Sequence, residues 1–267
     1  MTTGLVAESP ALGRPIAYSF YAPAAPRPWP LVYLLHGLEG HERDWLEAGG
    51  LAATLDRAIA DGMPPLAVAM PMAGNSWYVD SDAFGPVHRA LATDLVAVVE
   101  ARHQAGGCRQ ARAAGGLSMG GYGALLLAFA RPERYAAAVS LSGSIFRPMP
   151  EDAAARAQRR VRMFGPAFGD PFDWRRFNAW NLFLKLPAVA GAAPRPAFWL
   201  HAGDDDFPGI LDGTVALHLG LRQAGAESEL RVTEGGHEWP VWARDIGPAL
   251  HWLAGRLKGG CQSPPGT

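Results

Sequence analysis

A glycine-rich stretch in the middle of the chain, Gly115 to Ala124, constrains the fold more than any other segment. It places Ser118 in a GxSxG pattern, between a short run of small and apolar residues and an Ala- and Leu-rich segment typical of a buried helix. At such a strand-to-helix turn the serine backbone is strained, and a side chain two residues before or after it would collide with neighbouring backbone. Gly116 and Gly120 avoid these collisions. The pattern predicts a nucleophile elbow at the end of a sheet strand.

The helix expected directly after Ser118 sets the electrostatics of this turn. Its free amides and the positive end of its dipole would point to the place where an oxyanion develops. The amide of Met119 is therefore a candidate oxyanion donor. An incidental serine in a glycine-rich turn is the alternative, because GxSxG is short enough to recur by chance. The remaining site residues decide between the two interpretations.

Apolar runs of strand length alternate with helix-like segments along the chain. The strand-like runs lie at residues 16–21, 31–35, 66–70, 111–117, 136–141, 197–201 and 229–233. Between most of them apolar residues recur at the spacing of helices that cover a sheet. This alternation predicts an α/β fold with a mostly parallel, doubly wound sheet and helices on both of its faces.

One interval breaks the alternation. About fifty residues separate the run at 136–141 from the run at 197–201, which is long for a simple crossover. We expect a cap insertion at about 145–196, between the sixth and seventh core strands, with a helix at 151–163 whose arginines form a solvated face. The chain is then a single domain over residues 1–258, followed by a flexible C-terminal tail at 259–267.

Composition narrows the classes of partner. The 267-residue chain has a formal net charge of −1, which gives no general attraction to nucleic acid or to an anionic membrane. The first 21 residues lack the basic and apolar regions of a signal peptide, and no apolar run of 18 residues occurs. We therefore expect a soluble, cytoplasmic protein without nucleic-acid or membrane partners. Whether the chain forms a homo-oligomer is left open.

The two cysteines and the metal-binding residue types give no motif. Cys108 and Cys261 support neither a disulfide framework nor a thiolate metal site, so reduced thiols are expected. A candidate metal group would combine histidines and carboxylates of one loop, but its spacing matches no standard ligand motif: His36, His41, Glu42 and Asp44. We expect no metal and no cofactor.

Loops at the carboxyl ends of parallel strands are the places to look for partners of Ser118. A serine hydroxyl needs a base at neutral pH, and an imidazole serves when a carboxylate orients it. Ser118 is followed by the Asp204-Asp205-Asp206 loop and then by His237 in a glycine-flanked loop, the order of the α/β-hydrolase arrangement. We expect Asp206 to be the acid, with Asp205 as the alternative.

A loop after the run at 31–35 supplies a second oxyanion candidate. Gly37 permits a tight turn there, and the amide of Leu38 can face a substrate carbonyl together with that of Met119. Aromatic residues flank the proposed site loops and are candidate walls of an acyl or alcohol pocket, with ordinary core packing as the alternative: Trp45, Trp77, Tyr78 and Trp239.

Five segments in this order resemble the esterase D-like esterases, in particular the tributyrin-type bacterial esterases. They are LLHGLEG with Trp45, NSWYVD, GLSMGGYGAL, GDDDF and GGHEWPVW. The resemblance covers residues 16–257 and implies an α/β-hydrolase fold and a cofactor-independent serine carboxylesterase. In the related S-formylglutathione hydrolases and feruloyl esterases the acid is the third residue after the glycine of a GxxD loop, which corresponds to Asp206. The resemblance likewise implies the triad Ser118, Asp206 and His237 and the oxyanion amides of Leu38 and Met119.

The reaction expected from the resemblance is hydrolysis of a short-chain acyl ester, a small molecule, through an acyl-enzyme on Ser118. One alternative is acyl transfer, because mycolyltransferases use a similar fold and triad. Another is thioester hydrolysis of the S-formylglutathione kind, although Leu38-Glu39-Gly40 stands where that branch usually has a cysteine. A binding module that retains the fold without catalysis is the non-enzymatic alternative.

Overall fold

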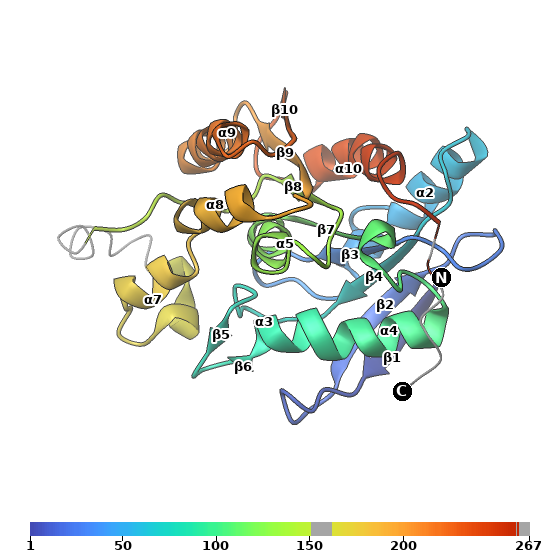
Figure 1. Ribbon diagram of the computed structural model, residues 1–267, viewed down its shortest axis with the longest axis horizontal. Helices are drawn as coiled ribbons and strands as arrows, with labels where there is room; N and C mark the ends of the chain where they lie inside the picture. Colours follow the sequence, from blue (N-terminus) through green and yellow to red (C-terminus); the bar gives the residue numbers. More distant parts are fainter. Residues whose placement is uncertain (151–161, 260, 262–267) are drawn as a thin grey trace.

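The computed structural model describes residues 1–150, 162–259 and 261. Within this part, eight strands form one sheet in the order β1-β2-β4-β3-β7-β8-β9-β10 (Figure 1). β2 is antiparallel to both β1 and β4, and every other neighbouring pair is parallel. The strands are β1 (Thr2–Ala7), β2 (Ile16–Tyr21), β3 (Leu31–Leu35), β4 (Ala67–Pro71), β7 (Arg112–Leu117), β8 (Ala137–Leu141), β9 (Ala197–Gly203) and β10 (Ser228–Thr233).

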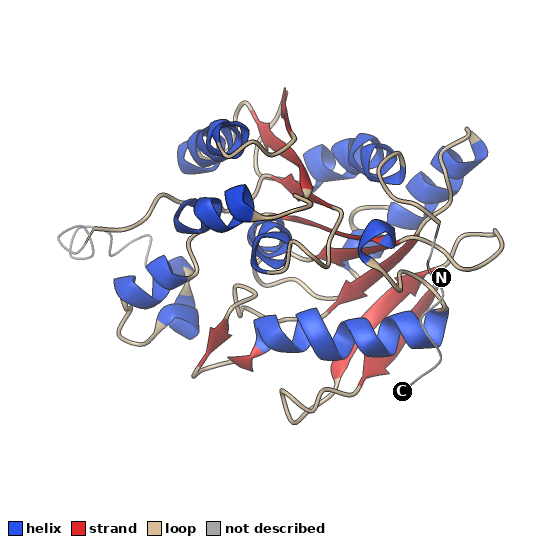
Figure 2. Cartoon of the chain, viewed as in Figure 1, coloured by secondary structure: helices blue, strands red, loops and turns tan. Residues whose placement is uncertain are grey.

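Helices cover both faces of this sheet (Figure 2). On one face pack α3 (Val87–Ala90), a π-helical turn (Leu91–Leu95), α4 (Val96–His103), α5 (Met119–Ala130), α8 (Leu182–Gly191) and α9 (Pro208–Gln223). On the other face pack α1 (Asp44–Glu47), α2 (Leu51–Ala60) and α10 (Trp239–Ala254). Successive side chains of β3 alternate between the two cores, with Tyr33 in one and Val32 and Leu34 in the other. Every residue of β3, β4, β7, β8 and β9 is buried, as expected for strands covered on both faces. The predicted α/β fold with a mostly parallel doubly wound sheet is therefore confirmed.

The sequence pattern does not indicate two strand pairs that the structure contains. β1 is mostly exposed and pairs antiparallel with β2 at one edge of the sheet, so it lacks the apolar signal of a covered strand. The short antiparallel pair of β5 (Asp80–Ser81) and β6 (Gly85–Pro86) lies in the loop between β4 and α3. Each strand of these pairs is held by its hydrogen-bonded neighbour and has no periodic sequence pattern of its own.

The segment between β8 and β9 contains short helices in place of a simple crossover. They are a 3₁₀ turn (Gly165–Phe168), α7 (Trp174–Ala179) and α8. The side chains of Phe164, Phe168 and Phe177 pack on one another with ring centroids 5.1 to 5.4 Å apart. Most of the helix expected at 151–163 lies outside the described residues, which resume at Arg162. The cap boundaries at 145–196 remain a prediction.

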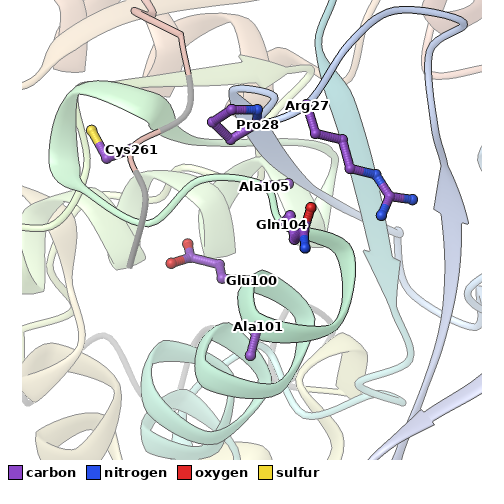
Figure 3. A pocket seen from close by; sticks show the side chains of 7 residues that line it. All are labelled: Arg27, Pro28, Glu100, Ala101, Gln104, Ala105 and Cys261. Carbon is purple, nitrogen blue, oxygen red and sulfur yellow. The ribbon is translucent and has the colours of Figure 1, made fainter. Parts of the chain in front are cut away.

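A cavity of about 370 Å³ lies at the amino ends of the parallel strands (Figure 3). Arg27 and Pro28, which line it, precede β3, and Gln104 and Ala105 precede β7. The loops that carry the predicted site residues follow the carboxyl ends of these strands. They therefore lie at the opposite end of the strands from this cavity. In open α/β sheets ligands bind at the carboxyl ends, so this cavity is not the candidate active site.

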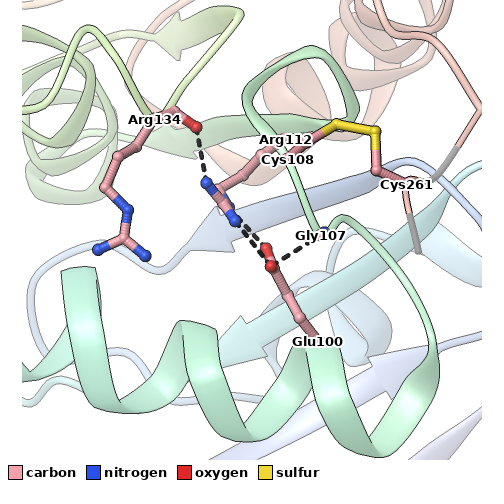
Figure 4. The surroundings of a disulfide bond; sticks show 6 residues. All are labelled: Glu100, Gly107, Cys108, Arg112, Arg134 and Cys261. Carbon is pink, nitrogen blue, oxygen red and sulfur yellow. Dashed lines mark hydrogen bonds and ion pairs between the residues drawn. A yellow bond between two sulfur atoms is a disulfide. The ribbon is translucent and has the colours of Figure 1, made fainter. Parts of the chain in front are cut away.

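Cys261, which also lines this cavity, forms a disulfide with Cys108 (Figure 4). The expectation of reduced thiols is therefore wrong. After α10 the chain returns to the loop before β7, where the amide of Lys258 donates to Gln110 (2.8 Å) and that of Cys261 donates to Gly106 (2.9 Å). A sequence separation of 153 residues hides this proximity, because only the tertiary fold brings the two segments together. Of the predicted tail at 259–267, residue 260 and residues 262–267 lie outside the described residues.

A buried ion pair anchors the same region. The guanidinium of Arg112 donates to Glu100 (2.7 Å), and the amide of Gly107 donates to the same carboxylate (2.9 Å; Figure 4). Arg112 also donates to the carbonyl of Arg134 (2.9 Å). The start of β7 is thus tied to α4 and to the disulfide loop, which fixes the strand that Ser118 follows.

Candidate active site

Ser118 occupies a strained turn between β7 and α5. Its φ of 52° and ψ of −121° lie outside the regions that a residue with a side chain normally adopts. A Cβ on Gly116 would come within 2.4 Å of the Gly120 carbonyl oxygen, and a Cβ on Gly120 would come within 2.4 Å of the Leu35 carbonyl oxygen. The glycines therefore permit the close approach of backbone that lifts the serine out of the sheet.

Ser118 Oγ, His237 and Asp206 form a continuous hydrogen-bonded chain. The distance from Ser118 Oγ to His237 Nε2 is 2.9 Å, and that from His237 Nδ1 to Asp206 Oδ1 is 2.9 Å. An ionised carboxylate can only accept, so Nδ1 carries the proton and Nε2 is free to accept the serine proton. The three residues come from the start of α5 and from the loops after β9 and β10. Folding of the sheet brings together groups that are up to 119 residues apart.

Burial separates Asp206 from the two preceding aspartates. Asp204 and Asp205 are exposed, whereas the side chain of Asp206 is inaccessible to solvent. Burial on its own would raise the pKa of Asp206, but the hydrogen bonds from His237 and from the Phe207 amide (2.8 Å) outweigh it, so this pKa lies below its ordinary value. Asp206 is thus an ionised partner for the imidazole. Asp204 accepts from the Gly235 amide (2.9 Å) and holds the loop that carries His237.

The two candidate oxyanion donors border the same cavity as the nucleophile. Met119 is the first residue of α5, and Leu38 follows Gly37 in the loop after β3. A Cβ on Gly37 would lie 2.7 Å from Leu117 Cδ1 and 3.6 Å from Ser118 Cβ, so this loop lies directly against the elbow. Only glycine allows that approach without displacing the Leu117 side chain.

The cavity above Ser118 has a volume of about 270 Å³. Two of the four predicted aromatic residues, Trp77 and Trp239, line it. Trp45 and Tyr78 are not among its lining residues. Trp45 donates from Nε1 to the Leu35 carbonyl (3.1 Å) and packs edge-on against Trp239 (5.5 Å), and Tyr78 donates to the His36 carbonyl (2.9 Å). Both therefore support the loop after β3 from behind.

Three further side chains of the cavity escape the sequence patterns. Phe207 is 65% exposed, and its ring centroid lies 5.2 Å from that of His237. The indole of Trp242 meets the imidazole edge-on at 4.9 Å, and the hydroxyl of Ser144 lies 3.4 Å from Ser118 Oγ. The position of Phe207 directly after Asp206 is a usable signal, whereas only the fold brings Ser144 to the nucleophile.

Two other histidines near the site have structural partners. His36 accepts from the Ala73 amide at Nε2 (3.0 Å) and contacts the Gly37 carbonyl through Nδ1 (2.7 Å), and burial lowers the pKa of its imidazole. His201 on β9 contacts Thr233 on β10 (2.8 Å) and Asp245 on α10 (3.0 Å) through Nε2. This cluster connects the strands whose following loops carry Asp206 and His237.

Neither a metal site nor a membrane span is found in the described ranges. Residues 1–150, 162–259 and 261 contain no group of three or more His, Cys, Asp or Glu side chains that could hold a metal ion. No helix there has the length and apolar character needed to cross a bilayer.

Comparison with known proteins places the chain in a family. The family model described as "Putative esterase" matches residues 9–253. An acetyl esterase of Caldicellulosiruptor saccharolyticus is 27% identical over 234 residues, which cover 84% of this chain and 82% of that protein. A solved ferulic acid esterase is 23% identical, with a TM-score of 0.74, over 95% of this chain and 96% of its own. FphF, a fluorophosphonate-binding serine hydrolase of Staphylococcus aureus, is 19% identical, with a TM-score of 0.77, over 94% and 96% of the two chains.

The two structural likenesses show a shared α/β-hydrolase fold. The family match spans most of the chain and agrees with the resemblance of the five sequence segments. The chain therefore belongs to this esterase family and is a hydrolase of the esterase class.

Proposed function

We propose that this protein is a serine carboxylesterase that hydrolyses short-chain acyl esters through an acyl-enzyme on Ser118. The observation that supports this most directly is the chain of two 2.9 Å hydrogen bonds from Ser118 through His237 to Asp206. Its geometry is that of an activated nucleophile with an oriented base.

Acylation follows from the roles of these groups. Ser118 Oγ attacks the ester carbonyl carbon while its proton passes to His237 Nε2, and the ionised Asp206 stabilises the imidazolium. The amides of Leu38 and Met119 donate to the oxyanion of the tetrahedral intermediate, aided by the N-terminus of α5. When the intermediate collapses, the bond from carbon to the alcohol oxygen breaks and His237 returns its proton to that oxygen. The products of this half-reaction are a free alcohol and an acylated Ser118.

Deacylation repeats the same steps with water. Water loses a proton to His237 Nε2 and attacks the acyl carbon, and the acid leaves as Ser118 regains the proton. An alcohol that attacked the acyl-enzyme in place of water would use the same groups. A thioester, in which sulfur stands in place of the ester oxygen, would also use them. Acyl transfer and thioester hydrolysis therefore differ from the proposed reaction in their substrates and not in the triad.

The size of the cavity supports a small acyl group. Its 270 Å³ lies below the usual range for sites that enclose drug-sized ligands. The side chains of Trp77 and Trp239 wall it, and the acetyl esterase relative acts on a short acyl group by its name. A small-molecule ester is the proposed substrate.

The disulfide bears on where the protein works. Disulfides persist in oxidising compartments and are rare in the cytosol. The bond between Cys108 and Cys261 therefore weighs against the cytoplasmic location expected from the sequence. We propose an oxidising compartment in its place, which fractionation of the native host would test by the redox state and location of the protein.

The activity is tested with p-nitrophenyl esters from acetyl to decanoyl, using the wild type and Ser118→Ala. A fluorophosphonate probe followed by mass spectrometry identifies the labelled residue. We expect turnover of short-chain esters, its loss in Ser118→Ala and a label on Ser118. Sugar acceptors and S-formylglutathione, added in parallel, detect transfer and thioesterase activity. A folded wild type with neither turnover nor label would contradict the proposal and favour a binding module.

A further inference from the structure

A second, narrow crevice lies next to the catalytic cavity, beneath the helices between β8 and β9. Its volume of about 10 Å³ is barely enough for one water molecule. Trp77 and Ser144 line both this crevice and the cavity that contains Ser118. The indole of Trp77 therefore stands at the boundary between the reacting serine and a closed apolar space.

Trp77 is held rigidly in this position. It is 1% exposed and has a φ of 55°, which is unusual for a bulky side chain and persists only where the surroundings enforce it. Its Nε1 donates to the Met163 carbonyl (3.3 Å), and its ring contacts those of Phe164 (4.7 Å) and Tyr122 (6.0 Å). The indole is thus a fixed wall rather than a side chain that swings freely.

The crevice behind this wall suits a hydrocarbon. Its lining includes Phe146, Phe168, Phe177 and Leu182. Away from Ser144, two of its polar side chains already have partners, since Tyr122 donates to the Trp180 carbonyl (2.9 Å). The amide group of Asn181 likewise donates to the Phe146 carbonyl (2.9 Å) and accepts from the Phe183 amide (3.0 Å). A polar acyl group would find these groups occupied, whereas an alkyl chain would bury apolar surface against the rings.

The chemistry of the proposed reaction gives the direction of the acyl chain. The leaving alcohol must lie against His237 Nε2 to receive its proton, in the region bordered by Phe207 and Trp242. The acyl chain then extends on the remaining side from the acyl carbonyl carbon that is bonded to Ser118 Oγ. Ser144, whose hydroxyl is 3.4 Å from Ser118 Oγ, and Trp77 border that side. A lengthening chain would meet the indole of Trp77.

We propose that Trp77 sets the upper limit of acyl length by closing off the crevice, which takes a longer alkyl chain only when the indole is removed. This inference rests on the proposed function, because it needs an acyl-enzyme on Ser118. Replacing Trp77 with a small residue would join the two cavities. Each methylene that entered the joined space would raise kcat/KM by about fourfold, from the free energy of burying one methylene.

The test measures the ratio of kcat/KM for p-nitrophenyl octanoate to that for the butanoate. We expect a low ratio in the wild type and a rise of tenfold or more in Trp77→Ala. Trp77→Phe keeps a ring in the wall and tests the proposal if Trp77→Ala fails to fold; it should raise the ratio in the same direction by a smaller factor. Adding Leu182→Trp to Trp77→Ala refills the crevice and should return the ratio toward the wild-type value.

Trp239→Ala is the matched control, because it removes the same side chain from the wall near His237. It should change the rates for all acyl lengths by a similar factor and leave the ratio unaltered. If the wild type is active and the ratio is unchanged in every folded Trp77 variant, the role of Trp77 in limiting acyl length is overturned, while the proposed function stands. A wild type that neither turns over any ester nor reacts with fluorophosphonate would overturn the proposed function, and this inference with it.

Discussion

Nδ1 of His237 lies 2.9 Å from Oδ1 of Asp206, a carboxylate that is inaccessible to solvent, while the neighbouring Asp205 is exposed. Two adjacent and chemically identical side chains thus differ in their exposure to solvent, which decides how strongly a carboxylate orients an imidazole. The exposed carboxylate would be screened by water, whereas the buried one interacts with the imidazolium at a lower local dielectric.

This difference predicts unequal effects of two matched substitutions. Asp206→Asn should lower kcat by about 10³- to 10⁴-fold, because an amide that donates to Nδ1 favours the wrong imidazole tautomer. Asp205→Asn should change kcat by less than about threefold, because the Asp205 side chain is exposed. Steady-state kinetics on the best p-nitrophenyl ester measures both. Equal losses in the two variants would contradict the assignment of Asp206.

The elbow predicts a sharp contrast between two glycines. Gly120→Ala should lower the free energy of unfolding by more than about 2 kcal/mol or prevent folding, because the new Cβ would lie 2.4 Å from the Leu35 carbonyl oxygen. Gly191 ends α8, and a Cβ there would have no atom within 4 Å. Gly191→Ala should therefore be neutral or stabilise by up to about 1 kcal/mol. Urea denaturation followed by circular dichroism gives both values, and a stable Gly120→Ala protein would count against the tight elbow.

The disulfide predicts a stability effect that is separate from activity. Cys108→Ser with Cys261→Ser should lower the free energy of unfolding by about 2–5 kcal/mol, since the bond closes a long loop in the unfolded chain. The specific activity of the folded variant should stay within about twofold of the wild type, because the bond lies at the strand ends opposite Ser118. Thermal melts with and without reductant measure the first effect.

Thiol titration of the denatured wild type supplies the direct check on this bond. Without reductant it should find no reactive thiol, and with reductant it should find both. Two free thiols in the protein purified without reductant would contradict the disulfide.

The lowered pKa values of several histidines predict that the protein loses stability in weak acid. Burial lowers the pKa of His36 and His201, and it lowers that of His103, together with the nearby charge of Arg102, to about 4. Below pH 6.5 the unfolded chain therefore binds more protons than the folded chain, so the free energy of unfolding should fall as the pH drops from about 6.5 to 4. His103 should contribute no more than about 2 kcal/mol to this loss, since solvent screens its half-exposed ring.

His103→Gln tests this contribution. The variant should lose less stability than the wild type between pH 7 and pH 4.5, in urea titrations at each pH. His251→Gln, which changes an exposed residue of α10, serves as the control and should follow the wild type. If the free energy of unfolding of the wild type stayed constant over this pH range, the lowered pKa values of these histidines would be contradicted.

The sequence indicates those parts of the fold that have a local cause. The apolar runs at β3, β4, β7, β8 and β9 are visible because each strand is buried along its whole length. The strained turn at Ser118 is visible because glycine must stand where backbone approaches backbone. β1 has neither signal, since an exposed edge strand is held by its partner.

Among the aromatic candidates, a loop position does not distinguish a pocket wall from its support. Trp77 and Trp239 face the cavity, while Trp45 and Tyr78 lie behind it and donate to backbone carbonyls. All four follow strand ends in the sequence. Their orientation depends on which neighbouring loops pack against them, and the periodicity of the sequence does not indicate this packing.

By itself, the sequence determined the α/β class and the elbow at Ser118, because each follows from a local pattern of residues, and it gave the order of nucleophile, acid and base because each of these residues lies in a loop after a strand-like run. Only the tertiary structure decided that Asp206 faces His237, that Cys108 reaches Cys261 and that Trp77 divides two cavities. These three relationships join segments that are distant in the chain. Their free energy comes from burial and contact after folding, which leaves no local pattern of residues to be recognised beforehand.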